Sequence, residues 1–466
     1  MPGHEMSTTT RLGQLRDHLD RSLFPAPPRL QPRRLTRVEA AVVIVALLTL
    51  GVVLALLRLG WSAALTTVWA EDGPIYLQAA LTQDFFHAVF SPYAGYLVVA
   101  PRLIAELATL VPLEYAPAAL SIVSALVAAL SGLAVWQASE GHVRNPYLRG
   151  GLALATVLAA TAGQETLDSA AYAPWYMLVA SFWLLFLRPR TMWGACLAGA
   201  FLLLTGLSTP GVWFFLPIAA LRALAIRDRR DTVLLGSFAV GAAAQVPVVL
   251  GQPQGESQWT SDIWTGFMQR VVDGGVFGQR LGGNLWADHG WLFLIVLGIA
   301  VLVGLAVGLR RSLPSASWFA ALAIPTGVVM FFASVYQRDV ATNIFWSPGT
   351  SGGTASRYVL VPTLLVISAA VVLIDGTVRR RRGESSGFSW PVAATVAVLL
   401  LAVVTSFDMS APGYRGAPYW EDALETAAAK CRTEPEGLAG IATAPAPFGV
   451  QIPCAEVASF APDDRS

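Results

Sequence analysis

Long apolar segments recur along the chain, separated by short charged loops, and they constrain its fold more than any other feature. About 20 consecutive apolar residues are needed to cross a bilayer as a helix. About eleven segments approach or meet this requirement: 38–60, 116–137, 149–165, 172–188, 192–207, 211–226, 232–250, 291–309, 314–335, 357–375 and 389–407. The sequence therefore predicts an all-α polytopic membrane protein.

The composition agrees with this fold class. The chain has 466 residues, of which 55% are hydrophobic and 13% are charged, whereas a soluble protein has about 25% charged residues. The formal net charge is +1, so the chain lacks the basic character of a nucleic-acid-binding protein. We therefore expect neither an ordinary soluble enzyme nor a nucleic-acid partner.

Arginine clusters in the short loops predict the orientation. Loops rich in Arg and Lys stay in the cytoplasm, and every cluster falls on one side if the spans alternate. These clusters are Arg33, Arg34 and Arg37; Arg144 and Arg149; Arg188 and Arg190; Arg227, Arg229 and Arg230; Arg310 and Arg311; and Arg379 to Arg382. The prediction is a multi-pass protein of the cytoplasmic membrane, with a cytoplasmic amino terminus and an extracytoplasmic carboxyl terminus.

This topology divides the chain into three parts: a cytosolic disordered tail at 1–37, a transmembrane domain at 38–407 and a small extracytoplasmic segment at 408–466. The apolar run 97–112 contains Arg102, Glu106 and two prolines. We interpret it as an amphipathic helix at the outer interface, because a span here would move every later arginine cluster outside. Residues 61–115 are then the first outside loop.

Two of the three cysteines, Cys431 and Cys454, lie in the carboxyl-terminal segment. Because this segment is predicted to face an oxidising compartment, we expect them to form a disulfide. The third, Cys196, lies inside a predicted span and is expected to be an inert packing residue.

Two adjacent acids, Glu71 and Asp72, open the first outside loop directly after the first span. Asp72 suits the cap of a helix beginning at Pro74, and this structural interpretation stays open. Paired carboxylates at a membrane boundary also suit general-base activation of a hydroxyl, or binding of a divalent cation such as Mg²⁺ or Mn²⁺ against a phosphate. His87, further along this loop, suits phosphate positioning or helix packing.

The order of these features resembles the GT-C membrane glycosyltransferases. A first span, an outside loop opening with an acidic pair, and interfacial helices form the layout of protein mannosyltransferases, lipid A aminoarabinose transferases, and mycobacterial mannosyl- and arabinosyltransferases. The resemblance implies that Asp72, or its neighbour Glu71, is the catalytic base. The second outside loop, GQETLDSAAYAPWYM at 163–177, resembles the place of a second acid in this family. It offers Glu165 and Asp168, with Gln164 beside them.

Two more segments resemble the family pattern. The segment 202–217, LLLTGLSTPGVWFFLP, is similar to the family's tight Gly-Pro turn between shortened spans. The segment SRYVLVPTLL at 356–365 resembles an Arg-Tyr-x-x-x-Pro entry to a late span. In the family this arginine meets the donor phosphate, which implies that Arg357 binds phosphate with help from Tyr358. Arg102 is a further candidate for the phosphate, although a pair with Glu106 in the same helix is the alternative.

The resemblance implies an inverting transfer of a sugar from a polyprenyl-phosphate donor to an envelope glycan, glycolipid or protein at the outer face of the membrane. Two other classes stay open. A transporter or flippase for lipid-linked sugars predicts polar residues along a path through the bundle. A non-catalytic scaffold for envelope assembly keeps the spans but needs none of the acids.

Overall fold

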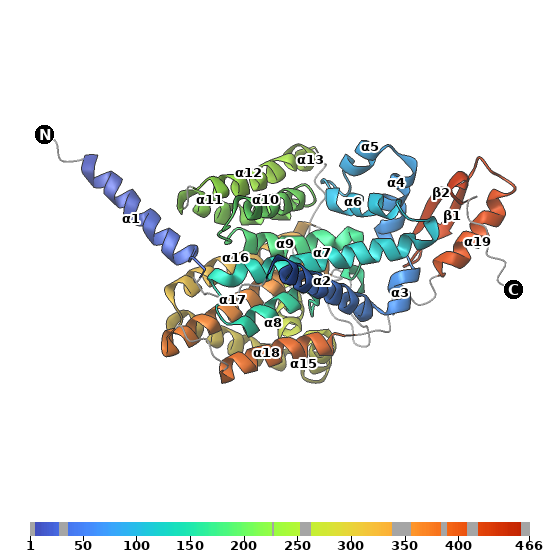
Figure 1. Ribbon diagram of the computed structural model, residues 1–466. Coiled ribbons are helices and arrows are strands. Elements are labelled where there is room, and N and C mark those ends of the chain that lie inside the picture. The colour runs from blue at the N-terminus through green and yellow to red at the C-terminus, as the bar shows by residue number, and fades with distance from the viewer. Residues whose placement is uncertain are drawn as a thin grey trace.

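The computed structural model describes residues 5–27, 36–225, 228–251, 262–337, 356–383, 389–407 and 418–457. The described elements are helices apart from one antiparallel pair of strands, β1 (Leu438–Ala442) and β2 (Gly449–Pro453). Figure 1 shows the helices gathered in one bundle, with the two strands at the end opposite α1 (Glu5–Leu23). The predicted all-α architecture is therefore confirmed for the bundle.

Six helical segments in the described part of the chain are long and apolar enough to cross a membrane. They are Arg37–Leu59 (α2), Leu113–Gly141 (which contains α7, Ala116–Ala138), Arg229–Leu250 (α12, Arg229–Ala244, and α13, Val246–Leu250), Ile263–Arg311 (which contains α15, Gly274–Arg311), Pro314–Gln337 (α16) and Arg357–Arg382 (α17). Each overlaps a predicted span. The finding supports a multi-pass membrane protein, although it does not confirm eleven full spans.

The predicted spans at 149–165 and 172–188 are shorter than expected. Helices α8 (Pro146–Val157) and α9 (Ala173–Leu184) have 12 residues each, which is about 18 Å of helix against roughly 30 Å of bilayer core. Most of the chain between them is buried. Helix α8 ends at Val157 and α9 begins at Ala173 with Pro174 in its first turn, and the loop between them has a left-handed backbone at Asp168 (φ +52°). The acidic loop therefore lies inside the fold.

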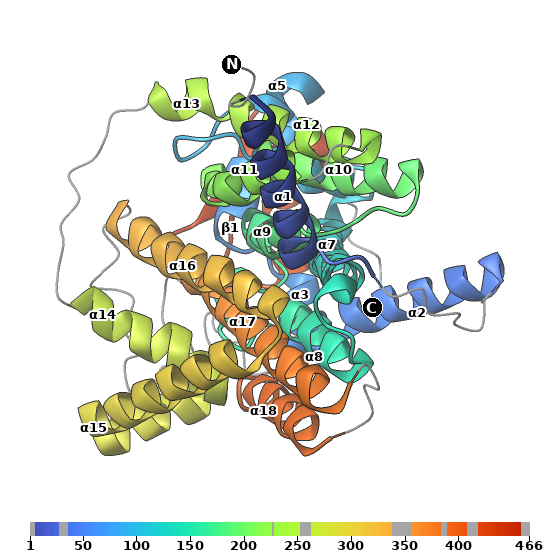
Figure 2. The same cartoon turned by 90° about the vertical axis from the view of Figure 1, so that its left-hand side faces the viewer.

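Three other predicted spans are also short apolar helices in the structure: α10 (Met192–Gly206), α11 (Leu216–Ala225) and α18 (Trp390–Thr405). Helices α10 and α12 pack against each other and form one side of the bundle. Helix α17 lies between α8, α9, α15 and α16. Figure 2 shows α17 near the middle of the bundle and α2 projecting from one side. Helix α17 therefore begins inside the protein, where neighbouring helices contact its first turn.

The amino-terminal region differs from the predicted disordered tail, because Glu5–Leu23 forms helix α1. Leu23 and Phe24 are fully buried in the core, and α1 packs against α11 and α16. Composition alone indicated disorder, because polar residues dominate this region and only a few apolar residues, such as Leu23 and Phe24, attach it to the core.

The run 97–112 forms α6 (Val99–Ala108), which at 10 residues is too short to cross a bilayer. It packs against α5 (Phe85–Phe90) and α7. This length agrees with the prediction that the run does not span. Most of α6 is buried, so the helix is part of the fold and not only a surface helix.

The carboxyl-terminal segment packs on the first loop. The indole N–H of Trp420 donates to the Leu113 carbonyl at 2.8 Å, and Ala444 exchanges backbone hydrogen bonds with Val68 and Ala70. Cys431 and Cys454 lie side by side in disulfide geometry, with Cα atoms 5.2 Å apart. The segment therefore forms a small support beneath the loop that carries the acidic pair.

The arginine-rich loops meet away from this segment, at the opposite end of the bundle. Contacts join loops that are distant in sequence: Arg144 N–H to the Asp375 carboxylate at 3.1 Å, Arg230 to the Arg190 carbonyl at 2.9 Å, and Arg380 to the Arg310 carbonyl at 3.3 Å. These contacts therefore bring the arginine-rich loops together in the part of the chain that the structure describes.

Candidate functional site

A cavity of about 470 Å³ opens where the first loop meets α9, α16 and α17. Its wall includes one carboxylate, Glu71, and one guanidinium, Arg357. Eight aromatic residues also line the cavity: Tyr76, Tyr93, Tyr96, Tyr172, Trp175, Trp213, Phe214 and Tyr358. The cavity therefore combines one carboxylate and one guanidinium with flat aromatic surfaces.

The two adjacent acids of the first loop point in different directions. Glu71 is on the cavity wall, while Asp72 is 2% exposed and is not among the lining residues. The Asp72 carboxylate accepts hydrogen bonds from Ala171 N–H at 2.8 Å, Ala170 N–H at 3.0 Å and Ser169 Oγ at 3.2 Å. Asp72 therefore caps the backbone that leads into α9, and Glu71 is the acid that a substrate can reach.

The hydroxyl of Tyr172 links Glu71 and Arg357 by hydrogen bonds. Its hydroxyl donates to Glu71 Oε2 at 3.1 Å and accepts from Arg357 Nη1 at 3.1 Å. The Arg357 guanidinium also lies over the rings of Tyr172 and Tyr358, with its carbon 5.4 and 4.9 Å from their centroids. One tyrosine thus fixes the spacing of two charged groups that are 286 residues apart in the sequence.

Glu165 is the second-loop acid that joins this group. Its Oε2 accepts from Arg357 Nη1 at 3.3 Å, and its Oε1 accepts from the Arg357 backbone N–H at 3.2 Å and Ser356 Oγ at 3.0 Å. Glu165 thus holds the first turn of α17 together with its arginine. It is not among the residues that line the cavity.

Asp168 lies elsewhere, although it is only three residues further on. It is 9% exposed, and its Oδ2 has no hydrogen-bond partner among the described residues. The charge of buried Arg58 acts on it, while the Arg58 guanidinium donates to the carbonyls of Ala159 and Ala162 at 2.6 and 2.8 Å. Asp168 therefore belongs to the buried support of this loop.

Burial changes the protonation of both buried aspartates. Loss of solvent raises the pKa of Asp72 to about 7, against the opposing effect of its three hydrogen bonds. Burial likewise raises the pKa of Asp168 to about 7, with the positive charge of Arg58 opposing the shift. Both groups thus titrate near neutral pH.

The predicted hairpin of 202–217 contributes to the wall through Thr209, Pro210 and Gly211. Thr209 Oγ1 accepts from the Gly211 N–H at 3.2 Å, and a side chain at Gly211 would meet Leu178 Cδ1 at 2.8 Å. Pro210 and Gly211 are therefore needed for a tight turn that packs against α9 beside the cavity.

Three predicted substrate-binding residues do not line the cavity. Arg102 is buried with its guanidinium 5.6 Å from the ring of Tyr76, on which it stacks. The expected Arg102–Glu106 ion pair is absent from the part of the chain that the structure describes. His87 is exposed on α5, outside the cavity wall, and the side chain of Gln164 lies outside the described residues.

Sequence reasoning missed the aromatic residues that connect and line the site. Tyr172 lies in the same segment as Glu165 and Asp168, and Trp213 lies in the predicted hairpin. A tyrosine after two acids carries no signal of its own, because its contacts with Glu71 and Arg357 come from distant parts of the chain.

A strained backbone accompanies the site. Three non-glycine residues of the described chain have positive φ: Ala70 (+40°), Ala94 (+52°) and Asp168 (+52°). Ala70 directly precedes Glu71, and Ala94 lines the cavity. Such a conformation costs about 1 kcal/mol or more, and the Ala70 N–H is held by the Ala444 carbonyl at 2.5 Å. The carboxyl-terminal segment therefore helps to orient Glu71.

The described residues form no cluster of protein ligands for the divalent cation that the sequence left open. Within the described ranges, no three His, Cys, Asp or Glu side chains come together as a possible metal site. Asp72 is committed to three donors and Glu165 to Arg357 and Ser356. Glu71 is left as the single carboxylate on the cavity wall, so any Mg²⁺ or Mn²⁺ held there would take its other ligands from water and a substrate phosphate.

Comparison with known proteins finds no matching family model and no matching curated protein. Solved structures of an archaeal oligosaccharyltransferase from Archaeoglobus fulgidus do match, and these are GT-C glycosyltransferases. The crystal structure with zinc and sulfate has a TM-score of 0.38 and 13% identity over 82% of this chain and 55% of that chain. The structure of this enzyme, AglB, with an inhibitory peptide and a dolichol-phosphate has a TM-score of 0.37 and 14% identity over 84% of this chain and 58% of that chain.

This chain spans a little over half the length of those enzymes. At a TM-score of 0.38 or below the likeness is distant, and nothing about the site of this chain follows from it.

Proposed function

We propose that this chain is a membrane glycosyltransferase that moves a sugar from a polyprenyl-phosphate donor to an envelope acceptor at the outer face of the cytoplasmic membrane. The observation that carries the proposal is the series of contacts from Glu71 through Tyr172 to Arg357 on the wall of one cavity. Transfer from a lipid phosphate needs a group that removes a hydroxyl proton and a group that binds the phosphate. Glu71 and Arg357 supply these two groups.

Glu71 acts as the general base in this proposal, in place of Asp72. A base must come within hydrogen-bond reach of the proton that it removes, and Glu71 is the acid on the cavity wall. Asp72 is a positioning residue, because its carboxylate holds the start of α9 and so fixes Tyr172 beside Glu71.

The reaction is a single displacement. The acceptor hydroxyl attacks the anomeric carbon of the donor as its proton passes to Glu71. The bond between that carbon and the phosphate oxygen breaks, and the electron pair leaves with the polyprenyl phosphate. Attack from the face opposite the leaving group inverts the configuration of the sugar.

Arg357 stabilises the leaving phosphate. Its Nη1 donates to Glu165 and Tyr172, and a guanidinium has five N–H donors in a planar fork. The remaining donors can bind phosphate oxygens while Glu165 and the rings of Tyr172 and Tyr358 keep the group in place. The aromatic walls offer flat surfaces on which a sugar ring can stack.

The experiment that tests the proposal measures sugar transfer from labelled polyprenyl-phosphate sugars in membranes that contain wild type, Glu71→Gln or Asp72→Asn. Loss of a general base lowers the rate by about 10²–10⁴-fold, so we expect this loss for Glu71→Gln. We expect Asp72→Asn to keep at least about a tenth of the activity, because the amide oxygen still accepts a hydrogen bond. Glu114→Gln, which changes an exposed acid of the same loop, is the matched control.

The same variants separate the alternative functions. Full activity of Glu71→Gln would show that the assigned base is wrong. A flippase would move the lipid-linked sugar between the leaflets of a vesicle membrane without forming a product. Because this transport needs no general base, Glu71→Gln would keep it. A scaffold would show no transfer with any donor, and Glu71→Gln would support envelope assembly as well as wild type.

A further inference from the structure

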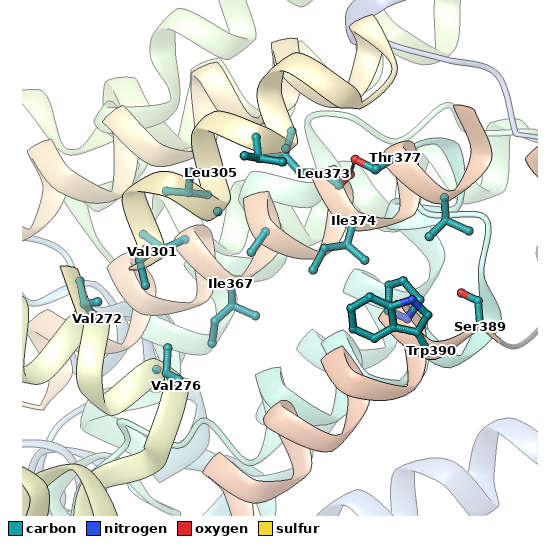
Figure 3. A pocket seen from close by; sticks show the side chains of 18 of the residues that line it. Val272, Val276, Val301, Leu305, Ile367, Leu373, Ile374, Thr377, Ser389 and Trp390 are labelled. Carbon is teal, nitrogen blue, oxygen red and sulfur yellow. Dashed lines mark hydrogen bonds between the residues drawn. The ribbon is translucent and has the colours of Figure 1, made fainter. Parts of the chain in front are cut away.

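A second hollow of about 440 Å³ lies between α15, α17 and the start of α18, apart from the candidate active site. Figure 3 shows apolar side chains of α15 and α17 along it, including Val301, Leu305 and Ile367, and Ser389 and Trp390 at one end. We refer to this hollow as the α15–α17 groove. Its wall is apolar along most of its length, as expected of a site for hydrocarbon chains.

Glycine makes room for the groove. A side chain at Gly304 would meet nothing within 4 Å, and one at Gly308 would come within 3.2 Å of Leu373. Both glycines line the groove. Because no other part of the described chain fills the space beside Gly304, an acyl chain can lie against the helix backbone there.

The end of the groove is polar and positively charged. Arg381, Arg382 and Ser389 line it, and Trp390, which is 78% exposed, occupies the position typical of a membrane-interface anchor. Ser389 is 5% exposed, and its Oγ has no hydrogen-bond partner among the described residues. A buried hydroxyl without a partner costs about 1–3 kcal/mol, so this end is suited to a ligand that supplies an oxygen acceptor.

We infer that the α15–α17 groove binds one anionic glycerophospholipid of the cytoplasmic leaflet. Its phosphate would lie at Arg381 and Arg382, an ester oxygen would accept from Ser389, and its acyl chains would run between α15 and α17. Basic pockets between transmembrane helices on the cytoplasmic side bind anionic head groups in this way. The arginine-rich end of α17 is the cytoplasmic end by the same charge rule that orients the spans.

The charge at this end argues against the tail of the sugar donor as the occupant. Arg381 is 24 residues beyond Arg357 on one helix, which is roughly 36 Å along the axis. A donor with its phosphate at Arg357 would present bare hydrocarbon to Arg381 and Arg382. The positive charge of the two guanidinium groups favours an anionic head group over hydrocarbon at this end. The inference does not depend on the proposed transfer reaction.

The test measures lipid binding to the purified, delipidated full chain by native mass spectrometry, with phosphatidylglycerol and phosphatidylcholine of identical acyl chains as probes. For wild type we expect one bound phosphatidylglycerol, with at least about tenfold higher affinity than phosphatidylcholine. Arg381→Gln/Arg382→Gln should remove this preference. Gly304→Leu, which fills the groove with a better helix former, should weaken the binding of both lipids by at least about tenfold.

Matched controls change the same residue types elsewhere. Arg310→Gln/Arg311→Gln removes two exposed arginines of the same end, and Gly236→Leu fills open space beside α12; both should bind phosphatidylglycerol like wild type. Unchanged binding by Arg381→Gln/Arg382→Gln, or equal affinity of wild type for the two lipids, would overturn the inference. It would also be overturned if a long-chain polyprenyl phosphate displaced phosphatidylglycerol with a dependence on Gly304 but none on the two arginines. Each of these three results would overturn the lipid inference but would leave the proposed sugar transfer standing.

Discussion

The side chain of Arg357 lies 3.3 Å from the carboxylate of Glu165, in a pair that joins the buried second loop to the start of α17. The same carboxylate accepts from the Arg357 backbone N–H. One acid therefore fixes both the helix terminus and the side chain that faces the cavity. In the proposed reaction Glu165 orients the phosphate-binding group without touching the substrate.

Removing the charge of Glu165 should weaken donor binding more than it slows the chemical step. Glu165→Gln keeps the shape and one oxygen acceptor but loses the ion pair, so the Arg357 side chain is less well held. A hydrogen bond to a charged group contributes about 1.5–3 kcal/mol, and we expect KM for the donor to rise by about tenfold with a smaller change in kcat. Steady-state transfer assays at varied donor concentration measure both.

A double-variant cycle checks that this effect acts through Arg357. Residues in direct contact have coupling energies of about 0.5–3 kcal/mol. The effects of Glu165→Gln and Arg357→Lys on kcat/KM should therefore be less than additive in the double variant. Strict additivity would mean that Glu165 does not position Arg357.

Loss of the Tyr172 hydroxyl should slow transfer without unfolding the protein. Tyr172→Phe removes the donor to Glu71 and the acceptor from Arg357, while the ring still packs beside Arg357. Two hydrogen bonds of about 1 kcal/mol each predict a decrease in kcat/KM of about tenfold or more. Tyr419→Phe, at a residue 58% exposed, is the control, and wild-type activity of Tyr172→Phe would contradict the bridging role.

The sequence could predict the membrane class and the region of the site, because hydropathy and charge act locally. Glu71, Glu165 and Arg357 were all among the predicted site residues. It could not assign their roles, since the direction of a side chain depends on distant partners. Asp72 turns from the cavity because the backbone at Ala170 and Ala171 binds it, although Glu71 and Asp72 look alike in the sequence.

Span lengths were overestimated for the same reason. The run at 149–165 is apolar because α8 and the following loop are buried in protein, so hydropathy does not distinguish them from one lipid-facing helix. Tyr172 carried no signal, because its role arises from Glu71 and Arg357 on other segments. Local patterns thus indicated which segments meet at the site, and tertiary contacts determined which atoms do.

The stability of the protein should fall as the pH rises from about 4 to above 7. Burial raises the pKa of Asp168 from 3.8 to about 7, so the folded state binds a proton more strongly than the unfolded state. The stabilisation from this proton is fully present below the pKa of Asp168 in the unfolded chain. It is lost as the pH rises through the pKa of Asp168 in the folded protein, and the total loss is on the order of 4 kcal/mol. Thermal unfolding in detergent between pH 4 and pH 8 measures the slope.

Asp168→Asn isolates this contribution, because the amide does not titrate. The variant should show a shallower decrease of Tm with pH than wild type, with the part due to Asp72 remaining. Glu114→Gln, at an exposed acid, should keep the wild-type slope. If Asp168→Asn and wild type have the same slope, Asp168 is not protonated in the folded protein at neutral pH.

Pairing of Cys431 with Cys454 should stabilise the segment that supports Glu71. The pair closes a separation of 23 residues, for which a disulfide contributes about 3 kcal/mol, and this segment holds Ala70 through Ala444. Cys431→Ser/Cys454→Ser should therefore make the segment more sensitive to protease and lower transfer activity, while the membrane bundle unfolds at a similar temperature.

Maleimide labelling of the denatured wild-type chain should modify one cysteine, Cys196, before reduction and three afterwards. Cys196→Ser, at an exposed position of the bundle, should leave protease resistance and activity unchanged, and three reactive thiols before reduction would refute the pairing.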